Sequence, residues 1–223
     1  ELTGVFRMPV VIEVHYTDGT KDSVRADVNA QRTLVEIPNT GRKTPSFVLF
    51  DPGSTILKKV SFDKPWDARV AQVKRAPRMI DRYDALESFR GDTSRIQERL
   101  DIIEDVMDRE RFHAMRSEAV GQAIELGQAG VTHAWKTVER GFKDPAVEVR
   151  SATINGLSII PQSLKGAAER LLEDSSYAII QTALTKLAWS FPSDRTSYVS
   201  KVRTVRGPHE RVRIARLELE AAD

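Results

Sequence analysis

The chain has 223 residues, 40% of them hydrophobic, so it can bury a sizeable core and hold one large or two modest domains. Its formal net charge is +2 and both signs are spread evenly along the chain, which argues against a general nucleic-acid-binding surface. The absence of cysteine excludes disulfides, thiolate catalysis and cysteine zinc sites, and leaves the cellular compartment open. No apolar run reaches the roughly 18 residues that predict a membrane span.

The first 65 residues carry the two-residue alternation of apolar side chains that is typical of β-strands. Thr17–Thr20 has the composition of a hairpin turn, and Asp51–Ser54 has Pro and Gly at the two central positions of a type II turn. We therefore predict a small antiparallel β-sandwich, or half of one, truncated at its N-terminus because five strands are few for a closed sandwich. The five predicted strands cover Pro9–Tyr16, Val24–Val28, Leu34–Ile37, Ser46–Phe50 and Ile56–Phe62.

The apolar spacing changes to a helical period at Trp66, which we interpret as a core residue between the two layers. From there to the C-terminus, Pro and Gly separate short amphipathic segments. The predicted helices cover residues 66–75, 78–90, 93–107, 109–127, 131–142, 145–158, 162–173, 175–190, 194–204 and 208–221.

A weak internal repeat runs through these helices. Its clearest copy is Asp144–Ala152, in which Asp144 can accept a hydrogen bond from a first-turn N–H and Pro145 suits the first helical position. The pattern resembles HEAT-like repeats, although its period is shorter and the fourth copy has no Arg. The predicted fold is thus α+β, with a β-sandwich over residues 1–65 and a HEAT-like α-α solenoid over residues 66–223; an ordinary helical bundle is the alternative. The small residues of the five copies, 31 to 34 apart, are Ala85, Ala119, Ala152, Ala183 and Ala215, and four copies have an Arg nearby, at Arg82, Arg116, Arg150 and Arg213.

A search for chemistry finds no catalytic pattern. The four histidines do not form H-E-x-x-H, and the sequence has no Gly-rich phosphate loop or G-x-S-x-G elbow. We therefore expect no catalytic residue, metal ligand or cofactor site in this chain.

One local charge asymmetry stands out near the C-terminus. Seven basic residues and a single acidic one lie between Arg195 and Arg216, which suits an anionic partner or a peptide carboxylate. The alternative is a charged edge of the helical array. The candidate contacts are Arg203, Arg206, Arg211 and Arg213.

Several segments together resemble the region downstream of the catalytic domain in bacterial zinc aminopeptidases of the aminopeptidase N family. The similarity is best over about residues 5–90, and beyond them it depends on the order of the elements. The segments are Phe6–Val14, Asp18–Gly19, Leu34–Pro38, Val48–Gly53, Ile56–Val60 and Met79–Leu86.

The resemblance implies a non-catalytic role. In that family another domain carries H-E-x-x-H, a distal Glu ligand and the motif that binds the substrate amine, and none of these is in this chain. The chain is then expected to be the C-terminal portion of the enzyme, whose zinc lies in a missing catalytic domain. Its partners would be that domain and the peptide substrate, with the helices closing over the active site and restricting access. The alternative is a free-standing HEAT-like scaffold that binds other proteins.

Overall fold

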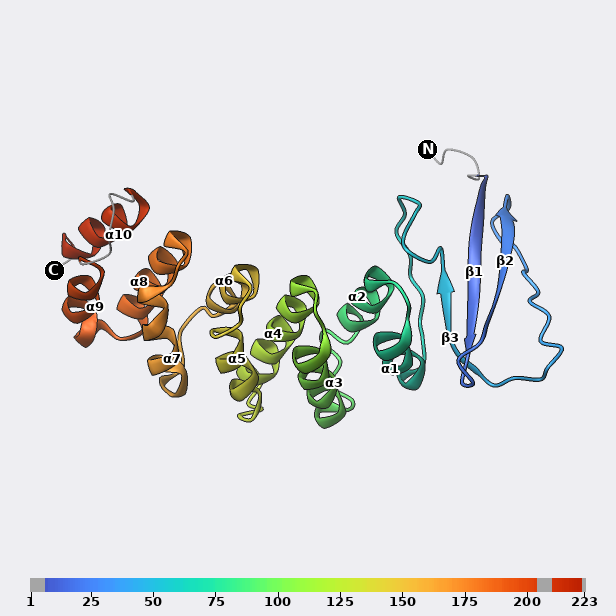
Figure 1. Cartoon of the computed structure of the whole chain (residues 1–223), viewed down its shortest axis with the longest axis horizontal. Coiled ribbons are helices and arrows are strands. Elements are labelled where there is room, and N and C mark those ends of the chain that lie inside the picture. Colours follow the sequence, from blue (N-terminus) through green and yellow to red (C-terminus); the bar gives the residue numbers. More distant parts are fainter. Residues whose placement is uncertain (1–6, 204–209, 222–223) are drawn as a thin grey trace. The chain divides into compact units, whose positions relative to one another are not determined.

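The computed structural model describes residues 7–203 and 210–221, and these residues form an α+β protein with three strands and ten α-helices. The chain divides into two compact units, Glu1–Gly91 and Asp92–Asp223. The first unit contains the strands and two helices, and the second contains the other eight helices (Figure 1).

The strands form one antiparallel sheet in the order β2-β1-β3. Strand β1 (Met8–Tyr16) joins β2 (Lys21–Val28) through a turn in which Asp18 accepts hydrogen bonds from the N–H and hydroxyl of Thr20. Strand β3 (Pro45–Phe50) pairs with the other edge of β1. The predicted hairpin and the strands it joins are confirmed.

Two of the five predicted strands are wrong. Leu34–Ile37 and Ile56–Phe62 have the alternating pattern of strands, but neither forms a strand in the structure. Leu34 is 85% exposed and Leu57 is fully exposed, so neither segment has a buried apolar face to fix its register. Within the described residues, the predicted sandwich is therefore a single three-stranded sheet.

Helices α1 (Trp66–Arg75) and α2 (Met79–Glu87) belong to the same compact unit as the sheet. Phe47 and Leu49 of β3 pack with Ala76, which follows α1, so a helix covers one face of the strand. Trp66 is buried, with its ring edge-on to that of Phe89 at 4.7 Å, which confirms its predicted place in the core. The compact unit thus continues beyond the change of period at residue 66.

The second unit consists of helices, and every predicted helix in it is found, with ends that shift by a few residues. Part of the segment 162–173 winds as 3₁₀-helix on both sides of α7. The helices are α3 (Ile96–Arg109), α4 (His113–Gln128), α5 (Ala134–Gly141), α6 (Val147–Gly156), α7 (Lys165–Glu169), α8 (Tyr177–Ser190), α9 (Arg195–Val202) and α10 (Glu210–Glu220).

Every second helix of this unit packs against the next in the series. Helix α4 contacts α6, α6 contacts α8 and α8 contacts α10, while the intervening helices pack beside them. Ala119, Ala183 and Ala215 are buried, as the repeat predicts. Ala152 is half-buried, whereas its neighbour Thr153 is fully buried and its hydroxyl donates to the Val149 carbonyl at 2.7 Å. The repeat is therefore displaced by one residue at Ala152.

Helices α4, α5 and α6 pack closely together at Gly141. A Cβ at this position would be 2.9 Å from Val120 Cγ2 and closer still to the Thr153 hydroxyl. We predict that Gly141→Ala destabilises the chain by about 1–3 kcal/mol, because overpacking forces the helices apart.

Gly166, in α7, is the matched control, since a Cβ there meets no atom within 4 Å. Gly166→Ala should be neutral or stabilise by up to about 1 kcal/mol, because Ala favours the helix. Urea unfolding of both variants measures the difference, and equal stabilities would contradict the close packing at Gly141.

Candidate functional site

Arg82, Arg116 and Arg150 make the same local contact at intervals of 34 residues. Each donates from Nη1 to the backbone carbonyls six and five residues earlier, in the segment that leads into its own helix. The accepting oxygens belong to Ala76 and Pro77 (3.1 and 3.4 Å), Glu110 and Arg111 (3.0 and 2.8 Å), and Asp144 and Pro145 (2.9 and 3.1 Å).

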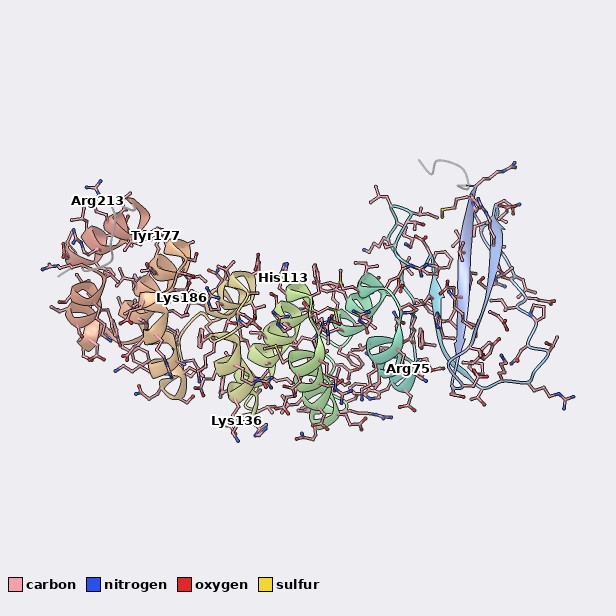
Figure 2. All side chains as sticks on the ribbon, in the orientation of Figure 1. Arg75, His113, Lys136, Tyr177, Lys186 and Arg213 are labelled. Carbon is pink, nitrogen blue, oxygen red and sulfur yellow. The ribbon has the colours of Figure 1, made fainter. Side chains whose placement is uncertain are left out.

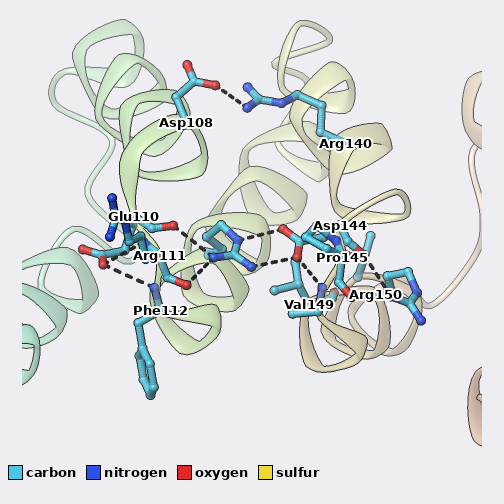
Figure 3. Close-up of polar contacts among 12 residues, drawn as sticks. Asp108, Glu110, Arg111, Phe112, Arg140, Asp144, Pro145, Val149 and Arg150 are labelled. Atoms are coloured by element: carbon cyan, nitrogen blue, oxygen red, sulfur yellow. Dashed lines mark hydrogen bonds and ion pairs between the residues drawn. The ribbon is translucent and has the colours of Figure 1, made fainter.

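Arg116 and Arg150 also reach forward to the next helix pair. Figure 3 shows Asp144, the acceptor of the first contact, with its interactions as dashed lines. Arg116 in α4 donates through Nε and Nη2 to the two carboxylate oxygens of Asp144, at 2.8 and 2.9 Å. Arg150 in α6 binds Asp174 in the same bidentate way, at 2.7 and 2.9 Å. We call these two ion pairs the Arg–Asp clamps. They tie α4 to the start of α6, and α6 to the start of α8.

Each aspartate also orders the backbone that leads into its helix. Oδ1 of Asp144 accepts from the Ala146 N–H and Oδ1 of Asp174 accepts from the Ser176 N–H, both at 2.8 Å. Helix α6 begins at Val147, so Pro145 lies before the helix rather than at its first position. The predicted capping role of Asp144 is thus displaced to the turn before the helix.

The clamps change the acidity of both carboxyls. Burial raises the pKa of Asp144, but hydrogen bonds from Arg116 and the Ala146 N–H outweigh it and leave the pKa below its ordinary value. The pKa of Asp174 is lowered in the same way, with burial opposed by Arg150 and the Ser176 N–H. Hydrogen bonds to the aspartates raise the pKa of Arg116 and Arg150.

The sequence indicated Asp144 as a helix cap and Arg116 and Arg150 as members of the repeat, but it did not show that these residues pair between copies. The signal was an Asp three residues before the first residue of the helix in neighbouring copies, at Asp144 and Asp174. The series stops at α8, where buried Ile180 takes the place of the Arg.

The first unit contains a cavity of about 480 Å³ between α1, α2 and the segment after β3. On one side, Asp51 accepts from the Ile56 N–H at 2.9 Å and pairs with Lys58. Burial opposes ionisation of Asp51, but hydrogen bonds from Lys58, Thr55 and Ile56 lower its pKa to about 2. This keeps the turn after β3 charged and ordered.

Lysine and carboxylate groups face the same cavity. Lys64 donates to Gln72 Oε1 at 2.6 Å, and burial lowers its pKa to about 8 against the attraction of Asp84 and Asp81. Burial, Asp81 and Glu87 raise the pKa of Asp84. The lining residues include no histidine, and their four basic and four acidic side chains balance one another. We therefore assign no reaction to the cavity.

Of the four arginines predicted to contact an anion, the structure describes the side chains of two, Arg203 and Arg213. Arg203 donates to Glu220 at 2.5 Å, and Arg213 is exposed on α10 (Figure 2). Arg206 and the side chain of Arg211 lie outside the described residues. An anionic contact at this end of the chain stays a prediction.

Over residues 7–203 and 210–221, no group of three or more histidine and acidic side chains is placed to hold a metal ion. In the same part of the chain, no helix has the length and apolar character needed to cross a membrane.

The sequence and the structure were compared with known families, proteins and structures. No family model matches the sequence. No curated protein and no solved structure matches it either.

We predict that the clamp between Arg150 and Asp174 is a coupled pair. The two side chains are 13% and 5% exposed, so replacing either one by Ala leaves a buried charge and should cost about 3 kcal/mol of unfolding free energy. A double-mutant cycle should give a coupling of about 1–3 kcal/mol.

The exposed pair Lys143–Glu139 is the control, with an expected coupling below about 0.5 kcal/mol. Equal coupling in the two pairs would show that the clamp contributes no more than an ordinary surface contact.

The lowered pKa values of Asp144 and Asp174 predict acid sensitivity. Each carboxyl binds its proton more weakly in the folded chain than in the unfolded chain, whose aspartates have a pKa of about 3.9. The clamps therefore contribute fully above that pH and lose their contribution as the pH falls through the folded-state pKa. Urea unfolding between pH 6 and pH 3 should show a smaller loss of stability in the Asp144→Asn/Asp174→Asn variant than in the wild type. An unchanged pH dependence would contradict this origin.

Proposed function

We propose that this chain is the non-catalytic C-terminal portion of a zinc aminopeptidase similar to aminopeptidase N, with a HEAT-like helical array. The observation that carries the proposal is a contact between two of the segments that carry the resemblance, Val48–Gly53 and Met79–Leu86. The Gly53 N–H, in the turn after β3, donates to Asp81 Oδ1 of α2 at 2.8 Å, and Gln72 donates to the Asp81 carbonyl at 2.7 Å. The resemblance thus includes residues that hold the sheet and the first helices together.

The clamps support the HEAT-like part of the proposal. A solenoid requires each helix pair to make the same contact with the next, so that a continuous core forms. Arg116–Asp144 and Arg150–Asp174 make such a contact twice in succession. The order of packing from α4 to α6, α8 and α10 agrees with it.

Zinc does not fit the residues that the structure describes. The sequence has no H-E-x-x-H, and the described histidines and carboxylates form no ligand group of three. His15 is engaged with Glu13 at 3.0 Å and stacked on Phe47. In the proposed parent, the metal and the chemistry therefore belong to a separate catalytic domain. The helices would close over that domain and restrict which peptides enter.

The coding sequence upstream of Glu1 tests the assignment first. We expect it to encode H-E-x-x-H followed by a distal Glu. A start codon directly before Glu1 would instead favour the free-standing scaffold. The isolated chain should release no product from aminoacyl reporter substrates, with or without added zinc, and metal-dependent turnover by a pure sample would contradict the non-catalytic role.

A truncation of the parent enzyme tests the restriction of peptide access. A parent enzyme truncated after Gly91 keeps the first compact unit whole. A truncation at Trp66 would instead remove the helix that covers β3. We expect the truncated enzyme to lose much of its discrimination between short and long peptides, measured as the ratio of their kcat/KM values. An unchanged ratio would exclude the second unit from substrate selection.

A further inference from the structure

The cavity of about 480 Å³ in the first unit has the size of a small-molecule site. Its charged lining is divided by sign, because three of the four carboxylates lie on α2 and the four basic residues lie between residues 58 and 69. Apolar side chains complete the lining. The three groups are Asp81, Asp84 and Glu87; Lys58, Lys59, Lys64 and Arg69; and Leu49, Phe50, Val60, Phe62 and Ala85.

Four of the eight charged side chains are engaged with other groups of the chain. Lys58 and Asp51 pair with each other. Arg69 donates to a backbone carbonyl at the C-terminal end of α2 at 2.9 Å, and Asp81 accepts from a backbone N–H of the turn after β3 at 2.8 Å. These contacts fix the walls of the cavity and leave two charges of each sign.

The other four charges line the cavity with few contacts. Lys59, Asp84 and Glu87 are exposed, and within the described part of the chain their side chains make no hydrogen bond or ion pair. Lys64 is half-buried, and of the three donors of its ammonium group one is used, in the bond to Gln72 Oε1 at 2.6 Å. The cavity therefore offers unused donors and unused acceptors together.

The acidity of Lys64 and Asp84 agrees with this lack of partners. Burial lowers the pKa of Lys64 to about 8, and the attraction of Asp84 and Asp81 does not restore it. Burial, Asp81 and Glu87 raise the pKa of Asp84. A ligand that placed an opposite charge beside each of these groups would stabilise both charged forms.

We propose that the cavity binds a small zwitterion, in which an aliphatic chain joins a primary ammonium group to a carboxylate. The carboxylate would accept hydrogen bonds from Lys59 and Lys64, and the ammonium group would pair with Asp84 and Glu87. The aliphatic chain would contact the apolar lining. A simple anion would meet the carboxylates of α2 unpaired, and a simple cation would meet the lysines unpaired, so the mixed lining selects a ligand with both charges. This inference does not depend on a catalytic domain.

NMR spectroscopy of the full chain, titrated with ε-aminocaproate, provides the test. Hexanoate and hexylamine are matched probes, since each keeps the aliphatic chain and lacks one of the two charges. We expect saturable shifts of the amide signals of cavity-lining residues with ε-aminocaproate. Binding of either matched probe should be weaker by about tenfold or more, because each loses one charge-assisted contact.

Two variants test the two ends of the ligand. Lys64→Met and Asp84→Asn each remove one charge with little change of side-chain size, and each should weaken ε-aminocaproate binding by about tenfold. Lys136→Met is the control, because this lysine is exposed on α5 in the second unit (Figure 2), and it should bind as the wild type does. Circular dichroism of each variant checks that the chain remains folded.

A free amino acid and a short peptide share the proposed chemistry, and γ-aminobutyrate and trialanine distinguish them. Tightest binding of trialanine would identify a peptide as the ligand, and tightest binding of either amino acid would identify a free amino acid. Three results would overturn the proposal. They are no saturable binding by any of the three zwitterions, equally tight binding of hexanoate or hexylamine, or unchanged binding in folded Lys64→Met and Asp84→Asn.

Discussion

The helical unit depends on a bidentate ion pair between an arginine in the first turn of one helix and an aspartate before the start of the next helix in the series. The pairs Arg116–Asp144 and Arg150–Asp174 are largely buried, and a buried charge is costly unless its geometry is satisfied. Each arginine meets that condition with backbone carbonyls of its own segment, and each aspartate with a backbone N–H. The clamps therefore specify which helix follows which more than they add to net stability.

The sequence predicted the helices well because each has a local signal and a partner within the chain. Apolar residues at helical spacing, with Pro or Gly at the joints, sufficed to locate every helix among the described residues. Strands were harder, since alternation indicates a strand without showing what it pairs with. Ile56–Phe62 alternates as well as β1 does, yet Leu57, Val60 and Phe62 are exposed and no strand forms. A strand needs a neighbour, and sequence pattern does not supply one.

The candidate sites also consist of residues that the sequence identifies and contacts that it does not predict. Arg116, Arg150 and Asp144 stood out in the sequence because they recur, but their pairing depends on which helices pack together. The cavity around Lys64 and Asp84 lies between α1, α2 and the irregular segment after β3, and the sequence alone did not show that these elements enclose it. Gly53 and Asp81 lie in two segments of the family resemblance, and their hydrogen bond is a contact that the resemblance alone did not predict. In each case the sequence shows which residue is present, but it does not show which other residue that one contacts in the folded chain.

Native-state hydrogen exchange on the Arg150→Ala variant tests most directly whether the clamps connect successive helix pairs. The lost clamp joins α6 to the start of α8. We therefore expect amide protection to fall in α6 and in α8 to α10, while α3 and α4 keep most of their protection. In Arg116→Ala, which breaks the clamp between α4 and α6, the loss of amide protection should begin at α4 instead of α6. A uniform loss of protection over the whole unit in both variants, or none in either, would contradict the account.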